Sequence, residues 1–314
     1  MSKKYEFNER IEALLQSFLF HLKGRKMNVN TIRQNRNYAG LYLEWLDKEG
    51  ITPAESNYND LLSFIDHCHK QRMPSRVINR ILLAIRHYYN HLDTGHNPAA
   101  GIVLKGAVRT IPHDLLSKED LEGLYNQYQV IDERSQRNKT ILGLLIYQAL
   151  TTEELHKLEA HHIKLKEGKI IVPGGRHSNG RTLKLEATQI LELHEYISMT
   201  RPKILKALNA GRPGRKPDQV KEESELHQLF ISMNGSEDMK VSLLNLMRAL
   251  RKIHVKVRNA KQFRQSVITE WLKEKDLRTV QYMAGHRYVS STERYRSYNL
   301  QDLEAALTEH HPLK

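Results

Sequence analysis

Apolar residues recur at helical spacing through the first third of the chain. This pattern marks four segments: residues 8–24, 31–48, 61–71 and 76–92. In each of them the apolar positions fall on one face of a predicted helix, which needs a partner surface to cover it. The periodicity breaks at His96, Asn97 and Pro98. We therefore expect a compact helical domain over residues 1–104.

A basic stretch with two glycines follows this helical region. Residues 101–112 include Lys105 and end on a proline, a composition typical of an exposed connection. We place a linker at residues 105–112 and a second domain at residues 113–314.

The second region mixes helical and strand-like patterns. A capped helix is predicted to begin after Ser117, and a buried helix over residues 139–150. Residues 169–172 and 181–185 alternate around a glycine-rich basic turn and predict a β-hairpin. Further helices are expected at residues 187–199, 241–255, 262–272, 278–283 and 300–307, with a surface insertion at 201–216. The predicted fold class is mainly α with a small β-sheet, a helical domain followed by a mixed α+β domain.

Charge and cysteine content narrow the function. The 314 residues include 49 Lys and Arg against 36 Asp and Glu, a net charge of +13. Before His113 there are 16 basic and 10 acidic residues, which leaves 33 and 26 from there on, so both regions are basic. This balance favours a polyanionic partner, with nucleic acid first and a membrane surface second.

Several other classes are disfavoured. The longest apolar stretch, near residues 141–150, is too short for a membrane span, and the start lacks a signal-peptide pattern. We expect a cytoplasmic protein that does not enter a membrane. The single cysteine, Cys68, excludes an internal disulfide framework and a thiolate zinc cluster. The histidine pairs lack the spacing of metal ligands on one helical face, so we expect no metal site.

The segment from Ala260 to Tyr295 carries the candidate chemistry. Arg264 lies 22 residues before His286, and Tyr295 follows that histidine by nine residues. A tyrosine oxygen that attacks phosphorus forms a covalent phosphotyrosyl ester. Cationic donors aimed at the anionic transition state would supply most of its stabilisation, and Arg264 and His286 are suited to that role.

These motifs resemble those of the tyrosine recombinases, closely the Xer and phage-integrase branch. Met283–His286 and Ser290–Tyr295 resemble the family's Gly-His box and its approach to the nucleophile, and Lys261–Ser266 stands at its His-x-x-Arg box. The stretch from Asn30–Arg33 through Trp45–Leu46, together with Leu83–Arg86, resembles the family's helical core-binding domain. Leu116–Leu121 resembles the start of its catalytic domain, and Leu229–Ser232 resembles the strand before the His-x-x-Arg box.

The resemblance implies a clamp on double-stranded DNA with inverted-repeat sites, in the cytoplasm and associated with the bacterial nucleoid. Tyr295 would attack the scissile phosphate to give a 3'-phosphotyrosyl intermediate, assisted by Arg264 and His286, with no cofactor. Family members act as homo-tetramers on two duplexes, some with a DNA-bending protein or a partner recombinase. Each protomer donates its C-terminal helix to a neighbour, and Leu300, Leu303, Ala306 and Leu307 form an apolar stripe suited to that contact.

Three positions depart from the family's pattern. Thr151 stands where the family has its first arginine, and losing one such donor typically costs about 100- to 1000-fold in rate. Arg176 aligns with the hairpin lysine that acts as general acid, although arginine releases protons poorly, and Lys184 is an alternative. Lys261 replaces the histidine of the box; it keeps the positive charge and loses a group that titrates near neutrality.

Two other interpretations stay open at this level. The protein is either an active recombinase or a catalytically decayed one that only binds or bridges DNA, and an unrelated basic helical RNA or DNA binder is a third alternative. A set of basic residues in the first region fits phosphate contact and an ordinary solvated face about equally well. These residues are Arg33, Arg36, Arg76, Arg80, Arg86 and Lys105.

Overall fold

The computed structural model describes residues 5–93, 95–105, 114–175, 178–209, 227–233 and 238–296. The chain divides into two compact units, Met1–Arg109 and Thr110–Lys314, each with its own apolar core. The domain boundaries at residues 104 and 113 stay a prediction, because residues 106–113 lie outside the described parts.

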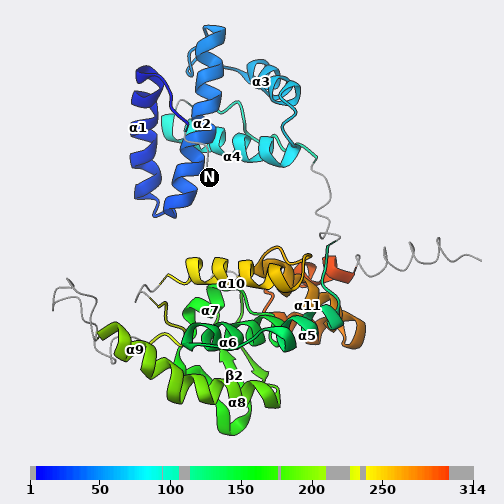
Figure 1. Cartoon of the computed structure of the whole chain (residues 1–314). Coiled ribbons are helices and arrows are strands. Elements are labelled where there is room, and N and C mark those ends of the chain that lie inside the picture. Colours follow the sequence, from blue (N-terminus) through cyan, green and yellow to red (C-terminus); the bar gives the residue numbers. More distant parts are fainter. Residues whose placement is uncertain are drawn as a thin grey trace, which may run out of the picture. The chain divides into compact units, whose positions relative to one another are not determined.

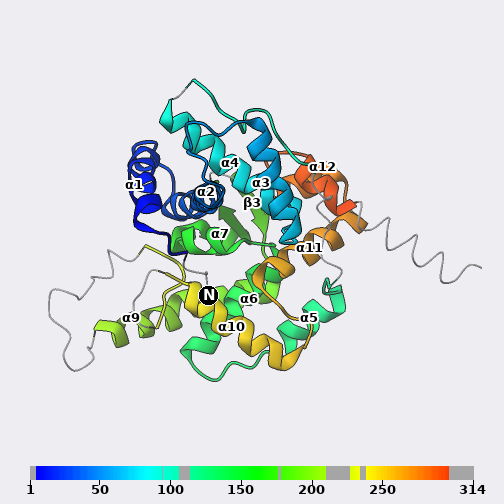
Figure 2. The ribbon, with the colours of Figure 1, turned by 90° about the horizontal axis from the view of Figure 1, so that it is seen from above.

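Helices build the first unit. They are α1 (Glu9–Gly24), α2 (Val29–Glu49), α3 (Tyr58–Lys70) and α4 (Ser75–Leu92). Asparagines at positions 8, 28 and 57 cap the first three, because each side chain accepts a hydrogen bond from the first turn. Helix α2 packs against both α1 and α4 (Figures 1 and 2), and the core between them includes the aromatic side chains of Tyr42 and Tyr88.

The chain that leaves α4 is bound back to that helix. Arg86 donates from Nε to the carbonyl of Ala99 at 3.1 Å and from Nη2 to that of Ile102 at 3.0 Å. Asn79 exchanges two hydrogen bonds of 2.8 Å with the backbone of Leu104. The predicted exposed connection is therefore fixed to the first unit as far as Leu104, because its backbone polar groups find side-chain partners there.

The second unit combines helices with a small antiparallel sheet. The helices are α5 (Lys118–Gln127), α6 (Glu133–Tyr147), α7 (Thr152–Lys157), α8 (Ala187–Glu195), the π-helix η3 (Tyr196–Thr200), α9 (Arg201–Asn209), α10 (Lys240–Ile253), α11 (Ala260–Glu274) and α12 (Leu277–Ala284). Two 3-10 turns, η1 (Ala160–His162) and η2 (Leu165–Glu167), flank the first strand. The sheet has the order β1 (Ile163–Lys164), β2 (Lys169–Val172) and β3 (Arg181–Lys184).

Helix α6 is the centre of this unit. Every residue from Ser135 to Ile146 is buried, and α6 contacts α5, α8, α9 and α11. Figure 1 shows α8 on one side of α6 and α10 and α11 on the other. The predicted fold class, mainly α with a small sheet, is confirmed, and so is the hairpin, in which Ile170 pairs with Leu183.

Two predicted elements differ from the structure. The segment expected to be a surface insertion from Arg201 begins instead with α9, because Ile204 and Leu205 are buried in the core. The segment Leu229–Ser232 is not a strand: the sole pairing described here is an isolated bridge between Glu159 and Gln228. The predicted helix at residues 300–307 lies outside the described residues.

The reason for the missing strand is that side chains take up its backbone acceptors. Tyr196 donates its hydroxyl to the carbonyl of Leu229 at 3.0 Å, and the buried Arg137 donates to that of Ile231 at 2.9 Å. Such bonds satisfy a buried backbone without a neighbouring strand.

Candidate active site

Arg264 lies at the junction of three segments of the second unit. It projects from the first turns of α11, whose N-cap Asn259 accepts a hydrogen bond from the backbone of Gln262. Its Nη1 donates to the carbonyl of Ala149 at 2.6 Å, and its Nη2 to that of Ala284 at 2.5 Å. The side chain is 11% exposed, so the guanidinium is held in one place with only an edge open to solvent.

A buried carboxylate stands behind this arginine. Glu154 on α7 binds Arg181 on β3 through two hydrogen bonds of 2.5 and 3.2 Å, and its Oε2 lies 3.7 Å from Nη1 of Arg264. The side chains of Arg181 and Glu154 are 0% and 5% exposed. Burial alone would raise the pKa of Glu154, but the hydrogen bonds and charge of Arg181 outweigh it and lower that pKa. The carboxylate is therefore charged, and it offsets one of the two positive charges of Arg181 and Arg264.

Neither Glu154 nor Arg181 was among the candidates from the sequence. Arg181 lies on the inward face of β3 together with Leu183, where an apolar residue is usual. An arginine at an inward position of a strand was the signal that pointed to a buried ionic partner.

Thr151 serves as the N-cap of α7. Its hydroxyl accepts from the backbone N–H of Glu154 at 3.1 Å and donates to Oε2 of that residue at 3.0 Å, while its own N–H donates to the same oxygen at 2.9 Å. Thr151 is thus a neutral capping group that fixes the carboxylate of Glu154.

A tight turn brings the hairpin to the histidine. Gly285 ends α12 with φ +66°, and a Cβ atom there would lie 2.5 Å from Nη1 of Arg181. The backbone N–H of Asn179 donates to the carbonyl of Gly285 at 2.9 Å, and Ser178 pairs with His286. Arg176, the predicted hairpin residue, lies outside the described residues.

His286 is a neutral group at neutral pH. Its Nδ1 lies 2.8 Å from Oγ1 of the fully buried Thr292, and the pair can form in either tautomer. Burial, followed by the positive charges of Arg264 and Arg294, lowers the pKa of His286 to about 4. Cationic neighbours and burial both oppose protonation of this imidazole.

Tyr295 is enclosed by the histidine and a further arginine. Its side chain is 2% exposed and its ring stacks on His286, with centroids 6.1 Å apart and planes 14° apart. Arg294 places its Cζ atom 5.0 Å from the centre of the tyrosine ring, and its Nη2 lies 3.3 Å from the tyrosine oxygen. The structure therefore gathers Arg264, His286 and Tyr295 as the spacing predicted, and adds Arg294.

The two predicted lysines lie differently. Lys261 is exposed on α11, one turn before Arg264. Lys184 is exposed on β3, three positions after Arg181, so it points to the opposite face of the hairpin from Arg181. The strand therefore directs Lys184 away from the side on which Arg181 meets Glu154.

The predicted phosphate-binding residues of the first unit fall into two groups. Arg36 forms an ion pair with Glu12, and Arg86 holds the segment after α4. The remaining ones are exposed: Arg33, Arg76, Arg80 and Lys105. In this second group the side chains are open to solvent, and Arg33 also donates a hydrogen bond to Asn30 at 3.0 Å.

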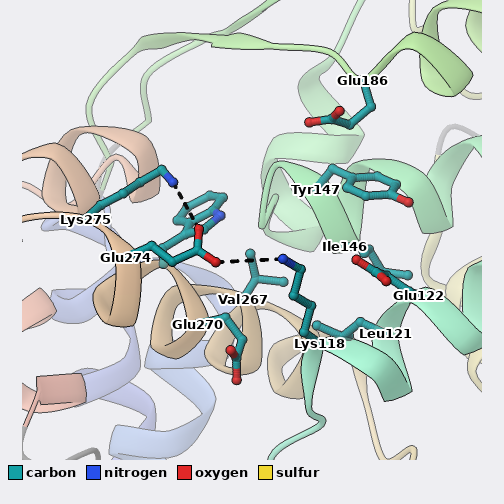
Figure 3. Close-up of a pocket in the computed structure, with 11 residues that line it drawn as sticks. Lys118, Leu121, Glu122, Ile146, Tyr147, Glu186, Val267, Glu270, Glu274 and Lys275 are labelled. Carbon is teal, nitrogen blue, oxygen red and sulfur yellow. Dashed lines mark ion pairs between the residues drawn. The ribbon is translucent and has the colours of Figure 1, made fainter.

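A separate pocket lies among α5, the end of α6 and α11 (Figure 3). Trp271, Tyr147 and several charged residues line it, and Glu274 there pairs with Lys118 at 3.7 Å and with Lys275 at 3.5 Å. It contains none of the residues gathered around Tyr295. Across the described part of the chain, the structure shows no cluster of three potential metal ligands, and no helix of the length and apolarity needed to cross a membrane.

Comparison with known proteins gives a consistent result. The profile of the phage integrase family matches residues 114–301. The chain is 24% identical to tyrosine recombinase XerC of Oceanobacillus iheyensis, over 96% of this chain and 97% of that protein. It is 26% identical to tyrosine recombinase XerD of Chlorobaculum tepidum, over 92% of this chain and 93% of that protein.

Solved structures share the fold. The XerH site-specific recombinase in a post-cleavage complex with a palindromic difH substrate superposes with a TM-score of 0.66 at 16% identity, covering 98% of this chain and 99% of that one. The Tn1549 transposon integrase, in complex with transposon right end DNA, gives a TM-score of 0.62 at 17% identity over 95% and 99% of the two chains.

Proposed function

This chain belongs to the phage integrase family, and on that premise we propose that it is a site-specific DNA recombinase that cleaves and rejoins duplex DNA through Tyr295. The observation that carries the proposal is the enclosure of Tyr295 by His286 and Arg294 next to the fixed guanidinium of Arg264. A buried tyrosine among three basic side chains suits an attack on a phosphodiester, whose transition state is anionic.

In the proposed reaction the oxygen of Tyr295 attacks the scissile phosphorus. The bond from phosphorus to the 5' oxygen breaks as the new ester forms, and the product is a 3'-phosphotyrosyl bond with a free 5' hydroxyl. The proton of the tyrosine passes to solvent. The leaving oxygen takes a proton from a general acid, for which Arg176 in the hairpin is the candidate. Attack by a hydroxyl of the partner strand reverses these steps and restores the tyrosine.

Arg264 and His286 have defined parts in this scheme. Each terminal nitrogen of Arg264 donates one N–H to a backbone carbonyl and has a second N–H that can donate to a phosphate oxygen. With Thr292 donating to Nδ1 of His286, the Nε2–H of that imidazole is a neutral donor to the same phosphate. Glu154 lies 3.7 Å from Arg264, and Arg181 donates to the carbonyl of Met283, three residues before His286.

The proposed partner is double-stranded DNA with paired inverted-repeat sites. The solved relatives named above were captured on DNA, and this chain carries a net charge of +13. Arg33, Arg76, Arg80 and Lys105 are its proposed phosphate contacts. We further propose a homo-tetramer on two duplexes, with an accessory DNA-bending protein or a partner recombinase as a further component, acting on the nucleoid in the cytoplasm.

One observation favours the alternative of a decayed recombinase that only binds DNA. Thr151 is engaged as a helix cap and brings no positive charge to the site. The two functions share every DNA contact and differ in one event, the formation of a covalent bond between Tyr295 and DNA.

The test is therefore a search for that bond. Nicked duplexes tiled across the DNA beside the gene trap a cleaved strand, because the short product diffuses away and cannot be rejoined. We expect an adduct that survives denaturant and maps to Tyr295 by peptide mass spectrometry. Tyr295→Phe should abolish it and leave the salt dependence of binding unchanged, while Tyr288→Phe, at an exposed tyrosine nearby, should retain it. Sequence-specific binding by the unaltered protein without any adduct would establish the alternative.

A further inference from the structure

Arg294 is placed to do more than flank the tyrosine. Its side chain is exposed, yet its Nη2 donates to the oxygen of the buried Tyr295 at 3.3 Å. The guanidinium also lies over the tyrosine ring, 5.0 Å from its centre. One end of this side chain thus meets the buried nucleophile while the rest faces the solvent from which DNA must approach.

The other guanidinium groups of the site are largely committed within the protein. Arg181 is fully buried and bonds Glu154 and the carbonyl of Met283. Arg264 donates one N–H of each terminal nitrogen to a backbone carbonyl. Among the described residues Arg294 forms no ion pair, and its hydrogen bond to Tyr295 uses one of its five N–H donors.

The charged groups around Tyr295 differ in whether a neighbouring group offsets their charge. The carboxylate of Glu154 offsets one of the two positive charges of Arg181 and Arg264, and His286 is neutral. Thr151 adds no charge because its hydroxyl caps α7. A phosphate that arrives at Tyr295 therefore meets Arg294 as a cation with no carboxylate partner among the described residues, beside the one positive charge that Glu154 leaves on Arg181 and Arg264.

We propose that Arg294 is a catalytic residue that binds the scissile phosphate during cleavage and supplies the positive charge that Thr151 does not. This inference rests on the proposed function. When phosphorus bonds to the oxygen of Tyr295, its non-bridging oxygens lie only two bonds from that oxygen. A guanidinium already within hydrogen-bond reach of the tyrosine oxygen then reaches them without moving its backbone, and its planar fork suits two oxygens at once.

The experiment compares two scissile groups in single-turnover cleavage of a nicked duplex. One duplex carries the natural phosphate, and the other carries a methylphosphonate, in which a methyl group replaces one charged oxygen. Arg294→Gln should slow adduct formation about 100- to 1000-fold on the phosphate, the usual effect of losing one such donor. On the methylphosphonate it should slow the reaction less than about tenfold, because less charge needs to be neutralised.

Matched variants complete the design. Arg296→Gln removes the same charge from an exposed residue on the other side of Tyr295 and should leave cleavage of both duplexes unchanged. Arg294→Lys should recover part of the loss on the phosphate, since it restores the charge without the fork.

The outcomes separate this inference from the function on which it rests. An Arg294→Gln protein that cleaves like the unaltered one, or that loses equal rates on both duplexes, would overturn the role of Arg294 and leave the recombinase function standing. Absence of any adduct with the unaltered protein on either duplex would overturn both. A loss confined to the phosphate duplex establishes the contact, because a purely structural defect does not distinguish the two scissile groups.

Discussion

Replacing Glu154 by Gln tests the buried ionic network that supports the site. The variant keeps the size of the side chain and removes its charge, which leaves Arg181 and Arg264 facing each other without a counter-ion. Breaking a buried pair by removing one partner typically costs about 3–5 kcal/mol. The two bonds of Glu154 to Arg181 are charge-assisted, at about 1.5–3 kcal/mol each, and their combined value of about 3–6 kcal/mol overlaps that range.

The neighbouring residue is a built-in control. Glu153 lies on the same helix and pairs with Lys157 at 2.8 Å, but its side chain is 63% exposed. Exposed pairs of this spacing contribute only about 0.3–0.5 kcal/mol, so Glu153→Gln should scarcely change the free energy of unfolding. The contrast between adjacent glutamates isolates burial as the cause.

The assay needs a signal from the second unit alone. The chain has two tryptophans, Trp45 in the first unit and Trp271 in the second. In a Trp45→Phe background, urea unfolding followed by the fluorescence of Trp271 reports the unit that contains Glu154. A loss below about 1 kcal/mol for Glu154→Gln, similar to that for Glu153→Gln, would refute the network.

A double-mutant cycle guards against a variant that is simply too unstable. Arg181→Met alone and together with Glu154→Gln gives the coupling between the two side chains. Residues in one buried network couple by about 0.5–3 kcal/mol, so the double variant should be more stable than the sum of the single effects predicts. Strict additivity would mean that the two groups do not interact in solution.

Two further predictions concern the turn and the histidine. Gly168→Ala, at φ +60° with only ordinary contacts, should lower the free energy of unfolding by about 1–2 kcal/mol. Gly285→Ala should lower it clearly more, because the added Cβ atom would lie 2.5 Å from Nη1 of Arg181. Equal losses in urea unfolding would contradict this close approach. Because folding lowers the pKa of His286 to about 4, the second unit should lose stability as the pH falls from about 6.5 to 4, and His286→Gln should weaken that dependence. An imidazole signal of His286 that titrates near pH 6.5 by NMR would refute the assignment.

Local signals in the sequence were sufficient for most of the elements. The cap at Ser117 and the apolar spacing after it act within a few residues, and α5 begins where they predict. The alternation across residues 169–172 and 181–185 likewise gave the strands of the hairpin. The same logic failed at Leu229–Ser232, because the partners of that backbone are Tyr196 and Arg137, which belong to distant helices.

The sequence by itself determined the helical and hairpin elements, the basic character of the chain and the register of Arg264, His286 and Tyr295, since each depends on residue type and short-range spacing. The tertiary structure alone decided how these side chains are charged and held. Arg264 meets Ala149 across 115 positions and Glu154 meets Arg181 across 27, contacts that no local pattern encodes. Burial then sets the charge of each group, because desolvation depends on everything packed around it. That is why the imidazole of His286 is neutral at neutral pH.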